Sequence, residues 1–394
     1  MRRSVAFWLS ASVLLAVSSQ AGELSIDAKD PRLLSHPELV AKIAETPHGY
    51  FRFVSGAFAA QTCRLFADAV ATLPEVNLHG DAHVEQYAVT SIGRGLTDFD
   101  DCTRGKPVID LVRFATSILL AVRQKGWKDE QAPLQEFLRG YRDGLGGDMH
   151  LSMPTPRLVT RIRTEFKWDH APALRRAHKL IDAAPLPNDA FADGVAQVEQ
   201  LVRFSRELPA GFFKVKRIGA LSMGIGSALD EKYLIIFEGR SEGPDDDLVV
   251  EAKQIRDLEG NPCVRTDVGA SRVLDGQRLI AYEPFAYAAV VPHGDKFFWV
   301  HDWTDEYVEA SIRKEIQDPR DLRELAYDAG VQMGRAHPKR PDGSPDKERQ
   351  HEAVRSLDRT EARVRAAARQ MAAETEAAWR EFRQAVSAPP VPPR

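Results

Sequence analysis

The sequence of 394 residues has few cysteines, no surplus of positive charge and no internal repeat. Its formal net charge of −4 argues against a general nucleic-acid-binding protein, because such domains usually carry a basic surplus. The spacing of the three cysteines, Cys63, Cys102 and Cys263, fits no zinc motif. They allow one disulfide with one free thiol in an oxidising compartment, or three small buried side chains.

The N-terminus has the pattern of a secretory signal. Arg2 and Arg3 precede an apolar run at residues 5–17, which is too short to favour a membrane span. Ser19 and Ala21 stand at the positions that a signal peptidase reads. We expect cleavage of residues 1–21 and export to the bacterial periplasm, with no membrane span afterwards. The alternative is an uncleaved anchor.

The composition, 43% hydrophobic and 28% charged, is that of a soluble globular protein long enough for two lobes. The patterns predict an α+β fold in which a strand-rich module stands between helical stretches. The expected parts are a helical lobe at 22–208, a β-rich module at 209–305, helices at 306–387 and a disordered proline-rich tail at 388–394. We expect long helices at 157–180 and 352–386, and strands at 212–218, 233–238, 248–255, 278–282 and 296–303.

Two acidic clusters within residues 78–101 dominate the sequence. Residues 87–90 read as a strand and residues 93–95 as a turn, so a hairpin would bring the two clusters to one rim. Asp81 and Asp98 would then face one ligand. Converging carboxylates repel one another unless a cation lies between them, and such oxygen ligands suit Mg²⁺ or Mn²⁺.

The first cluster begins with His79, Gly80 and Asp81. A carboxylate beside His83 on a tight glycine turn suits proton abstraction from an alcohol. The alternative is a polar turn held by bonds between its side chains and backbone. The second cluster, Asp98 to Asp101, predicts a metal site, and its alternative is a solvated turn.

Asp110 begins an otherwise apolar helix soon after these clusters. It is expected either to cap that helix or to brace the first cluster by accepting its backbone N–H groups.

A glycine-containing segment at residues 219–227 follows the first strand of the β-rich module. Its backbone N–H groups can cradle phosphates, and Lys253, in a later and mostly apolar strand, can neutralise phosphate oxygens. The alternative is an ordinary turn with a lysine that reaches the surface. The candidate phosphate-binding residues are Gly219, Gly224, Gly226, Ser227 and Lys253.

Residues 79–86 resemble the HGDxHxxN catalytic loop of aminoglycoside-phosphotransferase-like kinases, and residues 97–101 resemble their metal-binding aspartate motif. The segment from Tyr50 to His337 is similar, more closely, to an uncharacterised bacterial family, domain of unknown function 2252. The resemblance implies a two-lobed protein-kinase-like fold. The fold would be permuted, because the catalytic loop precedes the β-rich nucleotide lobe.

The resemblance implies catalytic roles for Asp81 and His83, with Asp98, Gln86 and Asp100 on Mg²⁺. Gln86 stands where the kinases carry an asparagine. The implied ligand is ATP or another phosphoryl donor, and the acceptor, a small molecule or a protein, is left open. The chain is thus expected to be an exported phosphotransferase. The alternatives are a degenerate kinase-like binding protein or scaffold, and a metal-dependent hydrolase that uses His79, Asp81, His83 and the aspartates of the second cluster.

Overall fold

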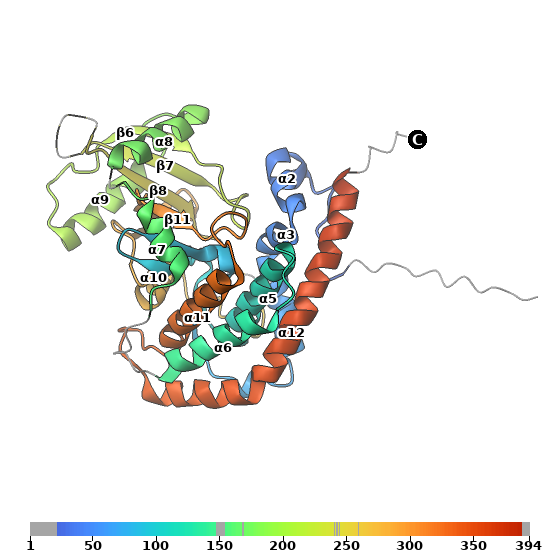
Figure 1. The fold of residues 1–394 in the computed structure, drawn as a ribbon. Coiled ribbons are helices and arrows are strands. Elements are labelled where there is room, and N and C mark those ends of the chain that lie inside the picture. The colour runs from blue at the N-terminus through green and yellow to red at the C-terminus, as the bar shows by residue number, and fades with distance from the viewer. Residues whose placement is uncertain are drawn as a thin grey trace, which may run out of the picture.

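The chain forms an α+β structure in which a sheet lies at one end and a layer of long helices at the other (Figure 1). This computed structural model describes residues 22–146, 154–167, 169–239, 241, 243, 245–258 and 260–387. The predicted mixture of helix and sheet is confirmed. The predicted signal at 1–21 and tail at 388–394 lie outside the described residues.

The main sheet is antiparallel and has six strands in the order β5–β6–β7–β8–β10–β9. Successive side chains of a strand point to opposite faces. In β7, Ile235 and Phe237 therefore pack with α9, whereas Leu234 and Ile236 pack with α8 on the other face. Helices thus cover part of both faces, which accounts for the apolar run of β7. The bounds are β5 Pro185–Leu186, β6 Val215–Ala220, β7 Lys232–Phe237, β8 Leu248–Gln254, β9 Ala289–His293, β10 Lys296–Asp302, α8 His170–Ala183 and α9 Ala192–Arg206.

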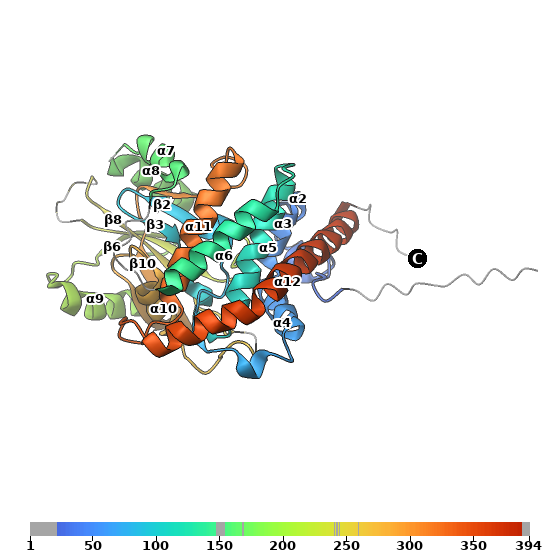
Figure 2. The same cartoon turned by 60° about the horizontal axis from the view of Figure 1, so that its bottom comes forward.

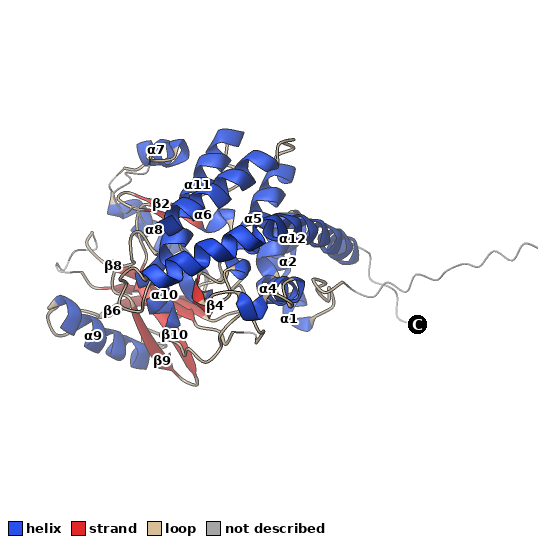
Figure 3. Cartoon of the chain, turned by 90° about the horizontal axis from the view of Figure 1, so that it is seen from below, coloured by secondary structure: helices blue, strands red, loops and turns tan. Residues whose placement is uncertain are grey.

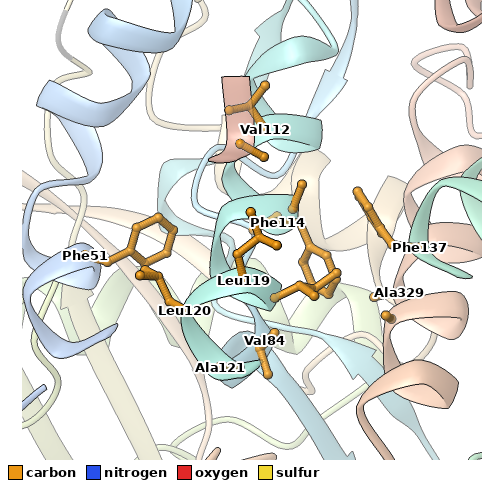
Figure 4. Packing of buried hydrophobic residues seen from close by; sticks show 14 of the residues in the cluster. Phe51, Val84, Val112, Phe114, Leu119, Leu120, Ala121, Phe137 and Ala329 are labelled. Atoms are coloured by element: carbon orange, nitrogen blue, oxygen red, sulfur yellow. The ribbon is translucent and has the colours of Figure 1, made fainter. Parts of the chain in front are cut away.

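Four long helices form the second layer: α5 (Val108–Gln124), α6 (Gln131–Gly146), α11 (Pro319–Ala336) and α12 (Lys347–Ser387). Helix α5 is buried along nearly its whole length, because α4, α6, α11 and α12 pack around it (Figures 1 and 2). Figure 4 shows Phe114 of α5 beside Phe137 of α6, with their ring centroids 4.7 Å apart. This core fixes α5, and with it the residues at its first turn.

Shorter elements connect the two layers, and the strands gather on the side away from α12 (Figure 3). Strand β2 (Tyr87–Thr90) pairs with β3 (Arg94–Leu96) and β11 (Tyr307–Glu309), and β1 (Val76–Leu78) pairs with β4 (Thr103–Gly105). The predicted hairpin is therefore confirmed, but its turn lies at residues 91–93 and not at 93–95, because Arg94 and Gly95 already pair with β2 as part of β3. The remaining helices are α1 Pro31–Leu34, α2 Pro37–Glu45, α3 Pro47–Phe53, α4 Ser55–Leu65, α7 Arg157–Thr164 and α10 Arg272–Ile280, with 3-10 turns at Val70–Thr72, Val84–Gln86 and Phe99–Asp101.

Two further sequence-based assignments are wrong. The strand expected at 278–282 is the end of α10 and the turn after it, because Val273, Leu279 and Ile280 form a helical apolar face against Phe99 and Trp299. The single helix expected at 157–180 is two helices, α7 and α8. Strand β9 was not predicted.

The cysteines form one disulfide, Cys63–Cys263, whose Cα atoms lie 5.7 Å apart, and Cys102 is free and buried. Of the two arrangements that the sequence allowed, the structure contains the bridge. It joins α4 to the segment that leads into α10. Among the described residues, no helix combines the length and the hydropathy needed to cross a bilayer.

Candidate functional site

The β2–β3 hairpin brings the two acidic clusters together. Residues Gln86 and Thr97 close its open end, where the Thr97 N–H donates to the Gln86 carbonyl at 2.9 Å. The Gln86 side chain then donates from Nε2 to Oδ2 of Asp98 at 3.1 Å. Asp81 and Asp98 line one small cleft, which we call the inner cleft. The predicted meeting of the two clusters is therefore confirmed.

Asp110 holds the first cluster in place from the first turn of α5. Its carboxylate accepts the backbone N–H groups of His79 at 2.7 Å and Gly80 at 2.9 Å, and it lies 3.2 Å from Nε2 of His337. Gly80 has a φ of +87°, and a Cβ there would lie 2.1 Å from the carbonyl oxygen of Asp101. Only glycine fits this turn. The expected bracing role of Asp110 is confirmed.

Asp81 is paired with Arg113, which α5 places beneath it. Nε and Nη2 of Arg113 lie 2.6 Å and 2.5 Å from Oδ1 of Asp81. The guanidinium also lies 3.8 Å from the ring centroid of Phe51. Burial, aided by the charge of Asp101, raises the pKa of Asp81 although Arg113 opposes the shift. A carboxylate with a raised pKa is a better proton acceptor near neutral pH.

Lys253 of β8 lies between the two aspartates of the second cluster. Its Nζ is 2.5 Å from Oδ1 of Asp98 and 2.9 Å from Oδ2 of Asp100. Burial would raise the pKa of Asp98, but the charge of Lys253 outweighs it and the pKa is lowered. For Asp100, burial and the charge of Asp98 raise the pKa to about 7. Lys253 is thus a buried cation shared by two carboxyl groups, as its apolar strand context suggested.

His83 is fully buried beside Asp81 and also lines the inner cleft. Its Nε2 lies 3.9 Å from Oδ2 of Asp81. Burial, together with the positive charge of Arg52, lowers the pKa of His83, so the ring is neutral at pH 7. Neither ring nitrogen has a hydrogen-bond partner in the described part of the chain.

A larger cavity of about 370 Å³, which we call the main cavity, adjoins this cluster, and Asp98 lines both spaces. One of its walls is aromatic: Phe285 stacks on His301 at 4.4 Å between centroids, and His301 packs on Trp299 at 4.3 Å. The turn around Gly224 and Ser227 and the side chain of Lys253 form another wall. Its basic lining residues are Arg52, Arg176, Lys232 and Lys253, and its acidic ones are Asp98, Glu251, Asp302 and Glu309. The space therefore combines apolar ring faces with side chains of both charges.

The structure brings most of the predicted site residues together, but not all. Asp81, His83, Gln86, Asp98, Asp100, Gly224, Gly226, Ser227 and Lys253 line the inner cleft or the main cavity, or pair with residues that do. Gly219 lies elsewhere, in β6, where a Cβ would meet the Cα of Ile181 in α8 at 2.9 Å. His79 turns its Nε2 to the carbonyl oxygen of Thr97 at 2.8 Å and lines neither space.

Sequence reasoning missed three cationic residues of the site. Arg113 interrupts the apolar pattern of α5, and that interruption is a signal that it serves a buried partner. Arg256 lies 3.1 Å from Asp101 and donates to the carbonyl of Gly226. Lys232 begins β7 next to a turn, and nothing in its sequence context distinguishes it from a surface lysine.

A family model described as "uncharacterized protein conserved in bacteria", domain of unknown function 2252, matches residues 31–184 and 162–385. The chain belongs to this family. The matched residues include both acidic clusters, α5 and the whole of the main sheet. No curated protein and no solved structure matches the chain.

Within the described ranges, no group of three or more His, Cys, Asp or Glu side chains has an arrangement that could hold a metal ion. In the structure, the charged side chains of the site pair with one another instead.

Proposed function

We propose that this member of the family is a kinase-like protein with a permuted two-lobed fold that binds a nucleotide in the main cavity. We propose further that it acts as a Mg²⁺-dependent phosphotransferase. One observation carries the proposal: Lys253 of β8 meets Asp98 and Asp100 at the edge of a cavity that also has an aromatic wall and a glycine turn. In protein kinases a glycine-rich loop, a strand lysine and a metal-binding aspartate serve the phosphates together.

The order of the parts along the sheet supports this proposal. The turn with Gly224 and Gly226 joins β6 to β7, Lys253 lies on the next strand β8, and α10 follows it. Protein kinases likewise carry their glycine-rich loop before the strand lysine and follow that lysine with a helix. Here the clusters with Asp81 and Asp98 come before the sheet in sequence.

Two carboxylates and one amide of the site carry oxygen atoms of the kind that Mg²⁺ prefers as ligands. The ammonium group of Lys253 occupies the place between the carboxylates of Asp98 and Asp100 where a cation would neutralise both. These carboxylates, with the amide oxygen of Gln86, would hold the ion, and hard oxygen ligands are those that Mg²⁺ prefers. When bound, the ion would neutralise phosphate charge. Such binding requires Lys253 to move towards the phosphates.

Asp81 would accept the proton of an acceptor hydroxyl. Arg113 holds its Oδ1, whereas its Oδ2 lies 3.8 Å from the position of a Cβ on Gly226, at the inner cleft. Arg113 thereby fixes the orientation of the carboxylate and leaves one oxygen for the hydroxyl. Positioning and charge neutralisation supply most of the catalysis in phosphoryl transfer.

Thermal unfolding of the mature chain with ATP or ADP and MgCl₂ tests the binding step. A nucleotide at about 100 times its Kd stabilises the folded state by about 2.7 kcal/mol. We expect Asp98→Asn and Lys253→Met to lose this stabilisation, and Lys179→Met on the exposed face of α8 to keep it. The absence of a shift with either nucleotide in the wild type would contradict the proposal.

A second candidate function is binding without phosphorylation, and the pairing of Lys253 with both aspartates favours it. Turnover separates the two functions, because Asp81→Asn should abolish phosphoryl transfer and retain nucleotide binding if the chain is an enzyme. Nucleotide binding by a wild type that releases no ADP or phosphate would favour the binding protein. In the proposed reaction the phosphoryl donor is ATP or another phosphoryl compound. The location of the chain in the periplasm stays a prediction.

A further inference from the structure

Lys232 is a buried lysine without an acidic partner in the site. It begins β7, and only 6% of its surface is exposed. In the ranges that the structure describes, no carboxylate lies within the ion-pair distance of 4.0 Å from its Nζ. A buried charge that no opposite charge neutralises costs free energy. A ligand of opposite charge would supply the missing partner.

The hydrogen bonds of Lys232 direct its ammonium group to the glycine turn. Nζ donates to the carbonyl oxygen of Met223 at 2.7 Å and to the hydroxyl of Ser227 at 2.8 Å. It lies 3.4 Å from the position that a Cβ on Gly224 would take. An ammonium group has three N–H donors, so one is left for a ligand. Lys232, Ser227 and Gly224 all line the main cavity.

Lys232 also lies directly beside Lys253. The two residues are opposite each other in the antiparallel pairing of β7 and β8, and opposite side chains on one face are about 5 Å apart at Cβ. Both line the main cavity. Asp98 and Asp100 neutralise Lys253, whereas Lys232 forms no ion pair with any residue that the structure describes. Glu251 lines the same cavity but forms no ion pair with Lys232, so the two neighbouring lysines together offer contacts for an anion with more than one charge.

We propose that Lys232 is a second phosphate-binding lysine, which forms an anion subsite with Ser227 and the Gly224 turn for a phosphate group of a di- or triphosphate ligand. The position of the subsite next to Lys253 rests on the proposed function, whereas its preference for an anion rests on Lys232 alone. In this arrangement Lys253 takes one phosphate and Lys232 the neighbouring one. A ligand with two linked phosphates binds both lysines, and a monophosphate binds one.

Titration calorimetry with sodium pyrophosphate, with and without MgCl₂, tests the subsite in the mature chain. A hydrogen bond to a charged group contributes about 1.5–3 kcal/mol, so Lys232→Met should weaken pyrophosphate binding about 10- to 100-fold. Lys232→Arg keeps the charge and should stay within about fivefold of the wild type. The control is Lys179→Met, which removes an exposed lysine of α8 and should leave the affinity unchanged.

Lys232→Gln distinguishes between a lysine that contacts the anion and a lysine that only holds the glycine turn in place. The amide keeps a donor for the carbonyl of Met223 but carries no charge, so the subsite predicts the same loss as in Lys232→Met. This variant also serves as the test if Lys232→Met does not fold. Pyrophosphate affinity that stays within twofold of wild type in either variant overturns the proposal, as does a wild type that does not bind pyrophosphate.

The outcome also separates this inference from the proposed function. If the chain binds ATP through Asp98 and Lys253 but Lys232→Met changes neither ATP nor pyrophosphate binding, the subsite is wrong and the proposed function stands. If pyrophosphate binds and depends on Lys232 while ATP and ADP do not bind, the nucleotide function is wrong and the anion subsite stands.

Discussion

Reduction of the Cys63–Cys263 bridge should destabilise the folded chain strongly. The bridge joins residues 200 positions apart, so it constrains a long loop of the unfolded chain. The chain-entropy relation gives about 5 kcal/mol of stabilisation at 25 °C for a loop of this length. With an unfolding entropy of about 2.1 cal/mol/K per residue, each kcal/mol changes the melting temperature of a chain of 394 residues by about 1.2 °C, so reduction should lower it by roughly 6 °C.

The assay is thermal unfolding, followed by tryptophan fluorescence, with and without a reductant. Cys63→Ala/Cys263→Ala should unfold at the temperature of the reduced wild type and should not respond to the reductant. Cys102→Ala, which removes the free buried cysteine, should respond as the wild type does. A wild type whose melting temperature is the same in both conditions, or whose unreduced denatured chain titrates with three free thiols, would refute the reasoning.

Three further predictions concern the buried charges of the site. Arg113→Met leaves Asp81 buried without its partner and should lower the free energy of unfolding by about 3–5 kcal/mol in urea titrations, and a second change of Asp81 to Asn should recover most of the loss. Burial would raise the pKa of Glu85, but the charges of His48 and other groups hold it at about 2, below its usual 4.5. Ionised Glu85 therefore contributes about 3 kcal/mol to the free energy of unfolding above pH 4.5, and this contribution disappears as the pH falls towards 2. Glu85→Gln should remove this part of the pH dependence of the free energy of unfolding. Asp110→Ala removes the acceptor of two backbone N–H groups and should increase their hydrogen exchange by at least tenfold, whereas unchanged protection would show that Asp110 does not brace the turn.

Local patterns were sufficient for the elements that carry their own signals. The hairpin at 87–96, the strands around Lys253 and the glycine turn were predictable, because alternation and turn residues act within a few positions. The strand predicted at 278–282 is wrong because tertiary contacts, and not local patterns, decide the structure there. That short segment shows no clear period, and it is helical because its apolar side chains pack on Phe99 and Trp299, which come from distant parts of the chain.

The sequence by itself determined which residues carry the chemistry: two acidic clusters, a glycine at a turn that admits no side chain, and a lysine in an apolar strand. The tertiary structure alone decided their partners. It placed Lys253 between Asp98 and Asp100, set Arg113 beneath Asp81, and buried Lys232 with no ion pair to any described carboxylate. The physical reason is that charge pairing depends on separations of a few ångströms, and the packing of α5 and the main sheet sets these separations between residues that the sequence keeps up to 155 positions apart.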